Sequence, residues 1–543
     1  MLSRRALFGL QPRNGGPVLL CFFIAALPGI LLFASVALSQ SIDKKGIGLL
    51  DSVTITLKKQ PFIHLQEQDV EASHGRLQQE SGRFDTSLGA TLGHDRRDIP
   101  LTDLERQSLP GSASQLTETS TTKIDLRKEF RTGVSVTPSI GVTRTNTAPG
   151  PAQPANAGTV NFMISVPLLK GLGTGAAGAN ELAARRDMEA SILTLRRTLS
   201  QQVLTTVSSY WDYLAALRIL EQRSASEARA ERSYSETKQL IEGDERAAAD
   251  IERVAANLAV KAAARLEAEQ SLFRAKHALG LAMGLPFEEI ESLPLPVDDF
   301  PRAGAQNINK INTAAALKLF TDQSLKHRTD YLASEKAQES AQILVEQARN
   351  NLLPQLDFQV GLGYSGLKEG ADVLSFSAAP IDNIPGYSAL ASLTYRWPYK
   401  NNTARGLLLQ ATAAYRKTVI AADDLGRNIK SSVSQNISDL SKTALELAKY
   451  YDAADHYRKA VENEREKFLL GMSTLSDLLT TEDNLIAALI NLISAESAHA
   501  KALARLRFET GTLLAYGQER ISVGIEELTS VPFIEESEGS KSD

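Results

Sequence analysis

The side chains that most often carry chemistry are few in this sequence, and they do not gather. The seven histidines show no H-E-x-x-H pattern or other metal-ligand spacing: His64, His74, His94, His277, His327, His456 and His499. The single cysteine, Cys21, lies in an apolar run near the N-terminus, and no G-x-S-x-G motif offers an activated serine. The sequence therefore gives no support for an enzyme or for a metal site.

One glycine-rich stretch matches the pattern of a dinucleotide-binding loop. Residues 173–178 read GTGAAG and join a strand pattern to a helix pattern. Such a loop binds pyrophosphate at a helix N-terminus, and its fold needs a short helix, a parallel strand and an acid about 20 residues further on. Here the helical pattern continues for many turns and Glu189 lies inside it. We interpret the stretch as a strand-to-helix joint whose glycines let backbones pack closely, and we expect no cofactor.

Two long stretches, residues 167–284 and 398–511, hold apolar residues at three- and four-residue steps and contain no internal proline. This spacing predicts amphipathic helices. Glycine interrupts the pattern at Gly243 and Gly471, so each stretch is predicted to be a long antiparallel helical hairpin. About 65 helical residues span roughly 100 Å, which suits a coiled coil, a strut or a tunnel wall.

The two hairpins match in spacing. Asp250 to Gly284 and Asp477 to Gly511 are both 34 residues. An internal duplication explains this agreement better than chance does. Asp250 and Asp477 therefore occupy equivalent positions, just after the turn of each hairpin.

Between the predicted helices, apolar and small polar residues alternate with a period of two. The alternation covers residues 84–92, 124–142 and 160–166 in the first half, and 356–364 and 390–397 in the second. Segments of this kind, separated by polar loops, are typical of outer-membrane barrel strands, and equally of a half-solvated antiparallel sheet. Tyr395, Trp397 and Tyr399 at a strand end suit an interfacial aromatic girdle or a sheet-to-helix corner.

The N-terminus carries an export signal. Arg4, Arg5 and Arg13 precede an apolar run from residue 18 to 38, followed by small residues that suit cleavage. The run is long, so an uncleaved anchor is the alternative. The net charge is −5 with both signs interspersed, so nothing suggests a nucleic-acid partner and none is expected. No later run approaches a membrane helix in apolar length, so a membrane portion would have to be β-structure.

The predicted fold is mostly α with β, and the chain divides as follows. We expect a signal peptide at residues 1–39; a first repeat at 40–300, with a helix, strands in 84–168 and a long hairpin at 175–284; a second repeat at 301–515, with a helix at 311–350, strands in 354–397 and a long hairpin at 400–511; and a disordered acidic tail at 516–543.

Three motifs resemble those of the TolC-like outer-membrane efflux and export factors. They are PLLKGLG at residues 167–173, NLLPQL at 351–356 and FLLGMSTLSDLL at 468–479, and the resemblance covers about residues 48–515. It implies a homotrimer in which transmembrane strands close one barrel in outer-membrane lipid, while helices form a tunnel in the periplasm. It also implies a periplasmic adaptor and an inner-membrane transporter as partners. The strand–helix junctions would be Pro167, Gly171, Gly173, Pro354 and Pro398.

By the same resemblance, an acid just past the turn gates the tunnel. Asp477 matches it, with Asp250 as its counterpart, and three copies around an axis would attract cations and disfavour closure. The family's second acid is Thr480 here, and Glu482 and Asp483 lie on other helix faces. The alternative for Asp477 is a solvated carboxylate favourable to a helix N-terminus.

The hairpin tips would dock the adaptor. The second tip, Gly471, Met472, Ser473 and Thr474, has the small or apolar residues of the family. The first tip, Gly243, Asp244 and Glu245, is charged and one residue longer. The segment 123–144 is also additional to the usual two strands per half, and would either widen the barrel or form an external hairpin.

The sequence thus predicts an outer-membrane channel of a tripartite efflux pump or a type I secretion system. The alternative is a structural coiled-coil envelope protein without channel activity. The sequence does not choose between small-molecule and protein cargo.

Overall fold

The computed structural model describes residues 46–108, 111–151, 153–243, 249–301, 313–381, 386–516, 521–522 and 524–532. The expected signal peptide at 1–39 and the tip residues Asp244 and Glu245 lie outside these ranges. The first repeat contains α1 (Leu49–Lys59), α2 (Pro61–Gly82), β1 (Ser87–Pro100), α3 (Asp103–Ser108), β2 (Ser114–Glu129), β3 (Ser135–Ala148), β4 (Ala155–Pro167), α4 (Thr174–Ala177), α5 (Ala179–Glu242), α6 (Ala249–Ala282) and α7 (Phe287–Glu291).

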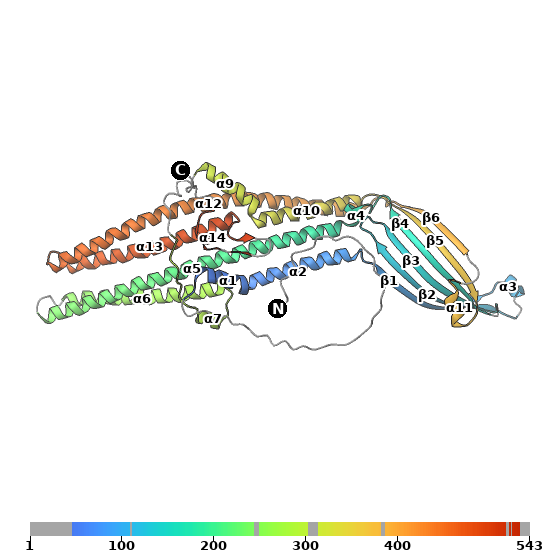
Figure 1. The fold of residues 1–543 in the computed structure, drawn as a ribbon, viewed down its shortest axis with the longest axis horizontal. Helices are drawn as coiled ribbons and strands as arrows, with labels where there is room; N and C mark the ends of the chain where they lie inside the picture. The colour runs from blue at the N-terminus through green and yellow to red at the C-terminus, as the bar shows by residue number, and fades with distance from the viewer. Residues whose placement is uncertain are drawn as a thin grey trace, which may run out of the picture. The chain divides into compact units, whose positions relative to one another are not determined.

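The second repeat begins with α9 (Ala314–His327) and α10 (Thr329–Asn350). It continues with β5 (Gln355–Glu369), α11 (Val373–Ala378), β6 (Gly386–Arg396), α12 (Asn402–Leu469) and α13 (Leu475–Glu509), and ends with β7 (Ala515–Tyr516), β8 (Ile521–Ser522) and α14 (Ile525–Thr529). Helices α5 and α12 have 64 and 68 residues, so the long helices that the period predicts are present (Figure 1).

The chain forms two compact units, which do not coincide with the two repeats. One unit consists of residues 1–61, 199–327 and 431–543, and the other of residues 62–198 and 328–430. Each therefore takes segments from both repeats. Helices α5 and α12 each begin in the second of these units and end in the first. Segments of the two repeats therefore pack together within each unit.

The first unit is built on the apolar faces of long helices. Val203, Val207, Tyr210 and Leu214 recur at three- and four-residue steps on α5 and are all at most 1% exposed. In the other hairpin, Leu447 and Ala454 of α12 pack against Leu492 and Ala495 of α13. Burial of these faces, rather than intrinsic propensity, stabilises helices of this length.

Asp298 attaches the start of the first repeat to α5. Its Oδ2 atom accepts hydrogen bonds from the backbone N–H of Leu49, at 2.7 Å, and from the hydroxyl of Tyr210, also at 2.7 Å. Burial, together with this bond, raises the pKa of Tyr210, so the hydroxyl stays a donor. Asp298, in the segment that links the two repeats, thus fixes the N-terminus of α1 against α5.

The second unit contains a six-stranded antiparallel sheet in the order β1-β2-β3-β4-β5-β6 (Figure 1). Strands β2 and β3, which cover the additional segment 123–144, pair over most of their length and lie between β1 and β4. The segment is therefore part of the sheet and does not form an external hairpin. The first half contributes four strands and the second half two.

Three details differ from the expectations drawn from sequence. The predicted helix at 311–350 is two helices, because Arg328 adopts an extended conformation between α9 and α10. The loop between β5 and β6 contains the helix α11. The tail expected to be disordered from residue 516 includes the strand β8 and the helix α14. Two contacts fix the α14 segment: Leu528 is fully buried, and the Arg507 guanidinium donates to the Ser530 backbone oxygen at 2.6 Å.

Among the described helices, α13 is long and apolar enough to cross a membrane, judged by length and composition alone. Core helices pass the same test. Its buried residues include Leu478, Ile486, Leu492 and Leu503, and α13 packs along α12 through Leu492. We therefore treat α13 as a core helix of the first unit.

Candidate functional site

The two faces of the six-stranded sheet differ in chemistry. Read across the register of paired strands, one face carries large apolar side chains that are at least 39% exposed: Leu88, Leu92, Leu126, Ile124, Ile140, Val160, Phe162, Leu362, Phe358 and Leu393. The opposite face carries mostly small or polar residues, with the exposed Met163 and Leu390 as exceptions. The small or polar residues include Gly89, Thr91, Thr121, Asp125, Ser139, Gly141, Asn161, Gln359, Gly361, Gly363, Ser388 and Ser392. An apolar outer face and a polar inner face are what a membrane barrel with a wet lumen needs. We call the apolar face the apolar belt.

Aromatic side chains lie at both limits of the apolar belt. At the end remote from the helices, the rings of Tyr364 and Tyr387 meet edge to face with centroids 5.8 Å apart. At the other end, Tyr395 is 60% exposed and Trp397 packs against Tyr399 at 6.4 Å. From Tyr387 to Trp397 the strand rises roughly 33 Å, or about 25 Å in height at a tilt near 40°, which matches the apolar band of outer-membrane barrels.

Strands β1 and β6 form the two edges of the sheet, and within the described residues neither has a partner on its outer side. An open edge leaves a row of backbone N–H and C=O groups unpaired, which lipid does not tolerate. The sheet of one chain is therefore incomplete as a membrane structure.

The strand-to-helix junctions predicted from sequence lie together in the second unit. The segment after Pro167 hydrogen-bonds to the segment around Pro354, since Leu168 N–H donates to Leu356 O at 2.7 Å. The N–H of Gly171 donates to Asn350 Oδ1 at 2.8 Å. Gly171 and Gly173 have φ of 85° and 89°, a region open to glycine, which is why the motif carries glycine there.

The junction of Pro398 joins the same cluster. Asn401, three residues later, has φ 44° and donates from its amide to the Leu352 backbone oxygen at 3.2 Å. The corners of both repeats thus support each other at the helix end of the sheet. Residues 173–178 form a turn and the four-residue α4, which fits a structural joint rather than a nucleotide loop.

A bidentate ion pair fixes the β2–β3 turn to the start of α5. Arg131 Nε and Nη2 donate to the two carboxylate oxygens of Glu181 at 2.6 and 2.7 Å. The Glu181 side chain is only 10% exposed, and the Arg131 guanidinium also lies 4.9 Å from the centroid of the buried Phe84 ring. The hydrogen bonds from Arg131 hold the pKa of Glu181 below its usual range.

We expect Glu181→Gln to destabilise the protein by about 1–3 kcal/mol at neutral pH, because it leaves the Arg131 guanidinium without its carboxylate. A depressed folded pKa gives stability that is present above the unfolded value and lost as pH falls through the folded one. The variant should therefore lose part of the acid-side fall in melting temperature, measured by circular dichroism from pH 7 to pH 3. Glu67→Gln, at an exposed carboxylate of α2, is the control. Equal acid profiles for the wild type and Glu181→Gln would contradict this role.

The tip between α12 and α13 presents an apolar cluster. Leu469, Leu470 and Met472 are 77%, 71% and 70% exposed, and Gly471 between them turns the chain with φ 72°. Behind them, Ser473 donates to the Glu464 carboxylate, which holds the pKa of Glu464 below its ordinary value. The cluster is therefore displayed on a braced turn.

Asp477 forms a capping box with Thr474 at the start of α13. The Thr474 hydroxyl donates to Asp477 Oδ2 at 2.6 Å, and the Asp477 N–H donates to Thr474 Oγ1 at 3.2 Å. The carboxylate also accepts from the Thr474 backbone N–H at 3.3 Å. The two hydrogen bonds that it accepts from Thr474 hold the pKa of Asp477 below its usual range, so the carboxylate stays ionised. The carboxylate thus caps the N-terminus of α13 and remains exposed to solvent. This is the position described by the alternative in the sequence analysis, a solvated carboxylate at a helix N-terminus.

The counterpart tip is described only in part. Gly243 follows α5 directly, and Asp250 lies in the first turn of α6, half-buried. The two acids thus share their place in the first turn after each tip. The comparison of Asp244 and Glu245 with Met472 and Ser473 rests on sequence alone.

Charged residues on all four long helices surround the carboxylate of Glu482, which sequence analysis set aside. Burial raises the pKa of Glu482, and the positive charges of Arg229 on α5, Arg465 on α12 and Lys261 on α6 oppose that shift. Lys261 also forms an ion pair with Asp483, and so joins α6 to α13. Helical periodicity places these residues on their helices but does not show which helices are neighbours.

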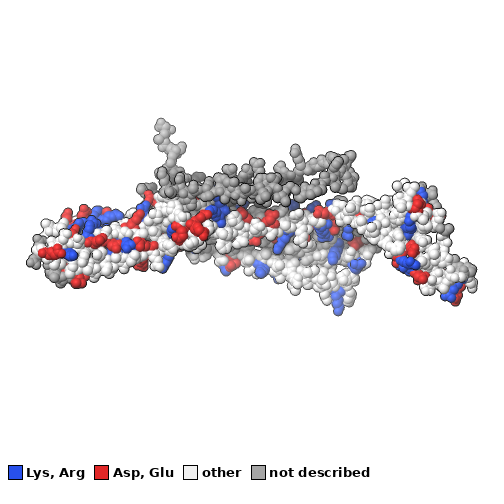
Figure 2. Space-filling model, turned by 90° about the horizontal axis from the view of Figure 1, so that it is seen from below, with Lys and Arg blue, Asp and Glu red and all other residues white. Residues whose placement is uncertain are grey.

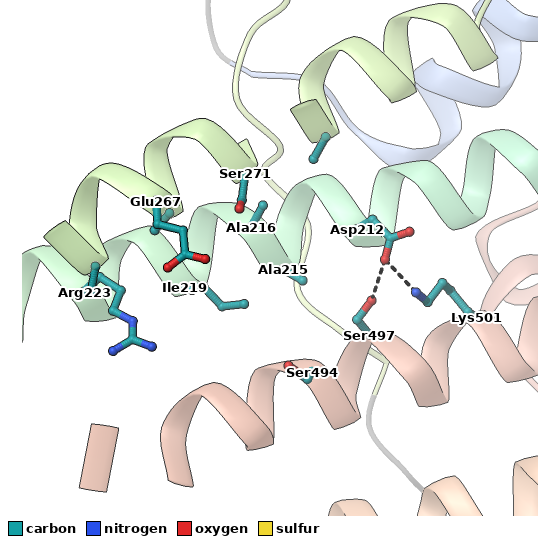
Figure 3. A pocket seen from close by; sticks show the side chains of 13 residues that line it. Asp212, Ala215, Ala216, Ile219, Arg223, Glu267, Ser271, Ser494, Ser497 and Lys501 are labelled. Atoms are coloured by element: carbon teal, nitrogen blue, oxygen red, sulfur yellow. Dashed lines mark hydrogen bonds and ion pairs between the residues drawn. The ribbon is translucent and has the colours of Figure 1, made fainter. Parts of the chain in front are cut away.

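A polar cavity of about 460 Å³ lies among α5, α6 and α13 (Figure 3). Lys501 Nζ lies 2.6 Å from Asp212 Oδ1, and Ser497 donates to the same oxygen at 3.5 Å, while Glu267 and Arg223 line the other part. Binding pockets for organic ligands are mostly apolar, so we interpret this cavity as a solvent-accessible gap between helices and not as a ligand site. Within the described ranges, no group of His, Cys, Asp or Glu side chains could hold a metal ion.

An amphipathic sheet with open edges, joined to long helices, is the arrangement expected of an outer-membrane protein with a periplasmic extension. A family model, "Outer membrane efflux protein", matches residues 320–512. This match covers about a third of the chain, and together with the relatives below it confirms the TolC-like resemblance that the motifs predict. Its location is the outer membrane, with a periplasmic extension.

Among characterised relatives, the chain is similar to the alkaline protease secretion protein AprF of Pseudomonas aeruginosa, with 26% identity over 321 residues. The alignment covers 58% of this chain and 63% of that protein, which is less than two thirds of its length.

Solved structures show the same fold at low identity. The outer membrane protein VceC of Vibrio cholerae has a TM-score of 0.61 at 14% identity, over 85% of this chain and 96% of that one. The outer membrane channel MtrE of Neisseria gonorrhoeae, in its open state, has a TM-score of 0.58 at 16% identity, over 85% of this chain and 88% of that one. The mostly helical fold with a β-sheet is therefore that of outer-membrane channels.

Proposed function

We propose that this protein is the outer-membrane channel of a tripartite export system, and that it conducts its cargo passively as a homotrimer. The observation that carries the proposal is the six-stranded sheet, apolar on one face and polar on the other, with an open edge on β1 and on β6. Cyclic association pairs each β6 with the β1 of the next copy and leaves no edge in lipid.

Six strands per chain suit this closure. Within the sheet every neighbour is antiparallel, so β1 and β6 run in opposite directions. A β6 edge therefore meets the β1 edge of the next copy in antiparallel pairing, as barrels require. Three copies give a barrel of about eighteen strands, whose diameter leaves a water-filled lumen.

The partners of the proposed trimer are a periplasmic adaptor and an inner-membrane transporter. The exposed apolar cluster of Leu469, Leu470 and Met472 supports docking at this tip, because apolar side chains on a braced turn are otherwise a solubility cost. The similarity to a protease secretion protein favours protein as the cargo over small molecules.

On the face shown in Figure 2, acidic and basic side chains are interspersed rather than separated by sign. A charge filter would therefore depend on residues at a constriction. We propose that Asp477 contributes one acid per copy to such a ring, because it is exposed, ionised and held by Thr474. Asp250 is proposed for the equivalent position on the first tip.

The test is conductance of purified trimers in planar bilayers. We expect ohmic channels that prefer cations, and we expect Asp477→Asn to lower the cation preference by at least about twofold, because three charges leave the constriction. Asparagine keeps an oxygen for the capping bonds, so α13 should stay intact. The measurement is the reversal potential in a salt gradient.

Glu466→Gln, at an exposed acid of α12 close to the tip, is the matched control and should leave the reversal potential unchanged. An unchanged preference in Asp477→Asn would rule out the gate role and leave only the cap. Folded trimers that conduct no current would instead support the structural coiled-coil alternative.

A further inference from the structure

The loop between β5 and β6 contains α11, a short helix with solvent-exposed aliphatic side chains. Val373 and Leu374 are 81% and 71% exposed, and Ile381, just after the helix, is 85% exposed. The other side of the same segment is buried through Ser375 and Ala379. The segment is therefore fixed on one side and apolar on the side that faces outward.

A polar network fixes α11 to the sheet. Arg144 Nε donates to Asn156 Oδ1 at 2.7 Å, and Arg144 Nη2 donates to the Asp372 backbone oxygen at 2.8 Å. Asn156, which is fully buried, donates from Nδ2 to the Gly370 backbone oxygen at 2.8 Å. The Arg144 guanidinium also lies 5.2 Å from the centroid of the Phe376 ring. Such a network holds the aliphatic side chains in a defined position.

The segment lies on the same face of the sheet as the apolar belt. A Cβ atom on Gly158 would meet Pro380 N at 2.2 Å and the Ala379 carbonyl carbon at 2.4 Å, so the chain crosses directly over the face to which Gly158 points. Val160, two residues along β4, points to the same face and belongs to the apolar belt. Two residues of strand are about 7 Å, so α11 lies just beyond the belt.

Helix α11 lies at the end of the sheet that is remote from the long helices. Strands β5 and β6 are joined there, whereas α10, α12 and the β4–α4 junction leave from the opposite end (Figure 1). With the helices in the periplasm, the α11 end is the outer one. The position just past the apolar band is that of lipid headgroups.

We propose that α11 and Ile381 form an interfacial foot, which inserts Val373, Leu374 and Ile381 into the headgroup layer of the outer leaflet. The proposal rests on the membrane insertion of the sheet proposed above. Lipid is favoured over a neighbouring copy as the occupant, because α11 lies against β3, β4 and β5, whereas the open edges are β1 and β6. The continuity of α11 with the apolar belt makes the foot an extension of the lipid contact.

The test uses single-cysteine variants of the full chain, with Cys21, the natural cysteine, replaced by serine. An environment-sensitive fluorophore is attached at Leu374→Cys in the foot, at Leu362→Cys in the apolar belt, and at Thr91→Cys on the polar face. The proteins are placed in vesicles of phosphatidylethanolamine and phosphatidylglycerol. Some vesicles contain lipids brominated near the headgroup and others lipids brominated near the chain end, and iodide is added from the water.

We expect the label at 374 to be quenched by shallow bromines at least about threefold more than the label at 91, and the label at 362 to be quenched most by deep bromines. The label at 91 should respond to iodide only. Ile381→Cys should repeat the result at 374. Quenching at 362, with labels at 374 and 381 as open to iodide as that at 91, would overturn the foot and leave the sheet in lipid. A label at 362 that no brominated lipid quenches would overturn the proposed channel as well.

Discussion

Gly284→Ala is expected to destabilise the native fold strongly. Gly284 ends the α6 segment with φ 71°, and a Cβ atom there would lie 2.7 Å from both Gln60 Cα and Lys59 O. Both contacts are with backbone atoms, so no side-chain rotation relieves them. A left-handed non-glycine residue costs roughly 1–2 kcal/mol, and overpacking adds about 1–3 kcal/mol, a large part of the stability of any domain.

The effect is expected to spread because the same contact positions the first helices. Gln60, which is 5% exposed, donates from Nε2 to the Ala282 backbone oxygen at 2.7 Å, and so ties the α1–α2 corner to the end of α6. The measurement is the yield of folded protein and its melting temperature by circular dichroism.

The matched control is Gly406→Ala. Gly406 lies inside α12, and an added Cβ meets nothing within 4 Å. Alanine in a helix interior is favoured over glycine by roughly 0.5–1 kcal/mol, so this variant should melt no lower than the wild type. If Gly284→Ala also melts at the wild-type temperature, the corner is not the tight contact that the structure describes.

If an adaptor docks at this tip as proposed, Met472→Asp is expected to abolish export while the fold stays intact. It places a charge in the centre of the exposed cluster of Leu469, Leu470 and Met472. Docking of an adaptor would then bury an unpaired carboxylate, and interface residues of this kind are typically worth at least 2 kcal/mol, or about thirtyfold in affinity. Binding of the proposed adaptor by the purified protein, and secretion by cells, are the measurements.

The structure offers two controls for that result. Met472→Leu keeps an apolar side chain at the tip and should preserve export. The melting temperature should be the same in the wild type and both variants, because residue 472 is exposed and contributes little to the packing of the helices. Wild-type adaptor binding by Met472→Asp would show that this tip is not the docking surface, in which case the charged tip after Gly243 becomes the candidate.

The parts of this fold that depend on local pattern were predictable. Apolar spacing gave α12 and α13 and the turn at Gly471, and alternation gave the strands, because both patterns record which face of an element is buried. The resemblance of the PLLKGLG, NLLPQL and FLLGMSTLSDLL motifs to one family was also correct. The role of Asp477 as a gate stays a prediction.

What depends on distant partners was not predictable. Alternation does not say which strand is the neighbour of which, so the place of β2 and β3 inside the sheet required the structure. Helix α11 has only six residues, and the contact that fixes it comes from Arg144, far away in the chain. The α9–α10 break at Arg328 carries no proline or glycine to announce it.

The open strands at the two margins of the sheet have a genetic consequence. If the edge strands of each copy pair with those of its neighbours, a defect in one copy affects the whole trimer. A single chain with a defective edge strand would leave the barrel of its trimer unclosed. With equal amounts of sound and defective chains, random mixing would leave only about one ring in eight wholly sound. A lesion in β1 or β6 should therefore behave as dominant, whereas one that prevents a chain from folding at all removes that chain from the pool and should be recessive.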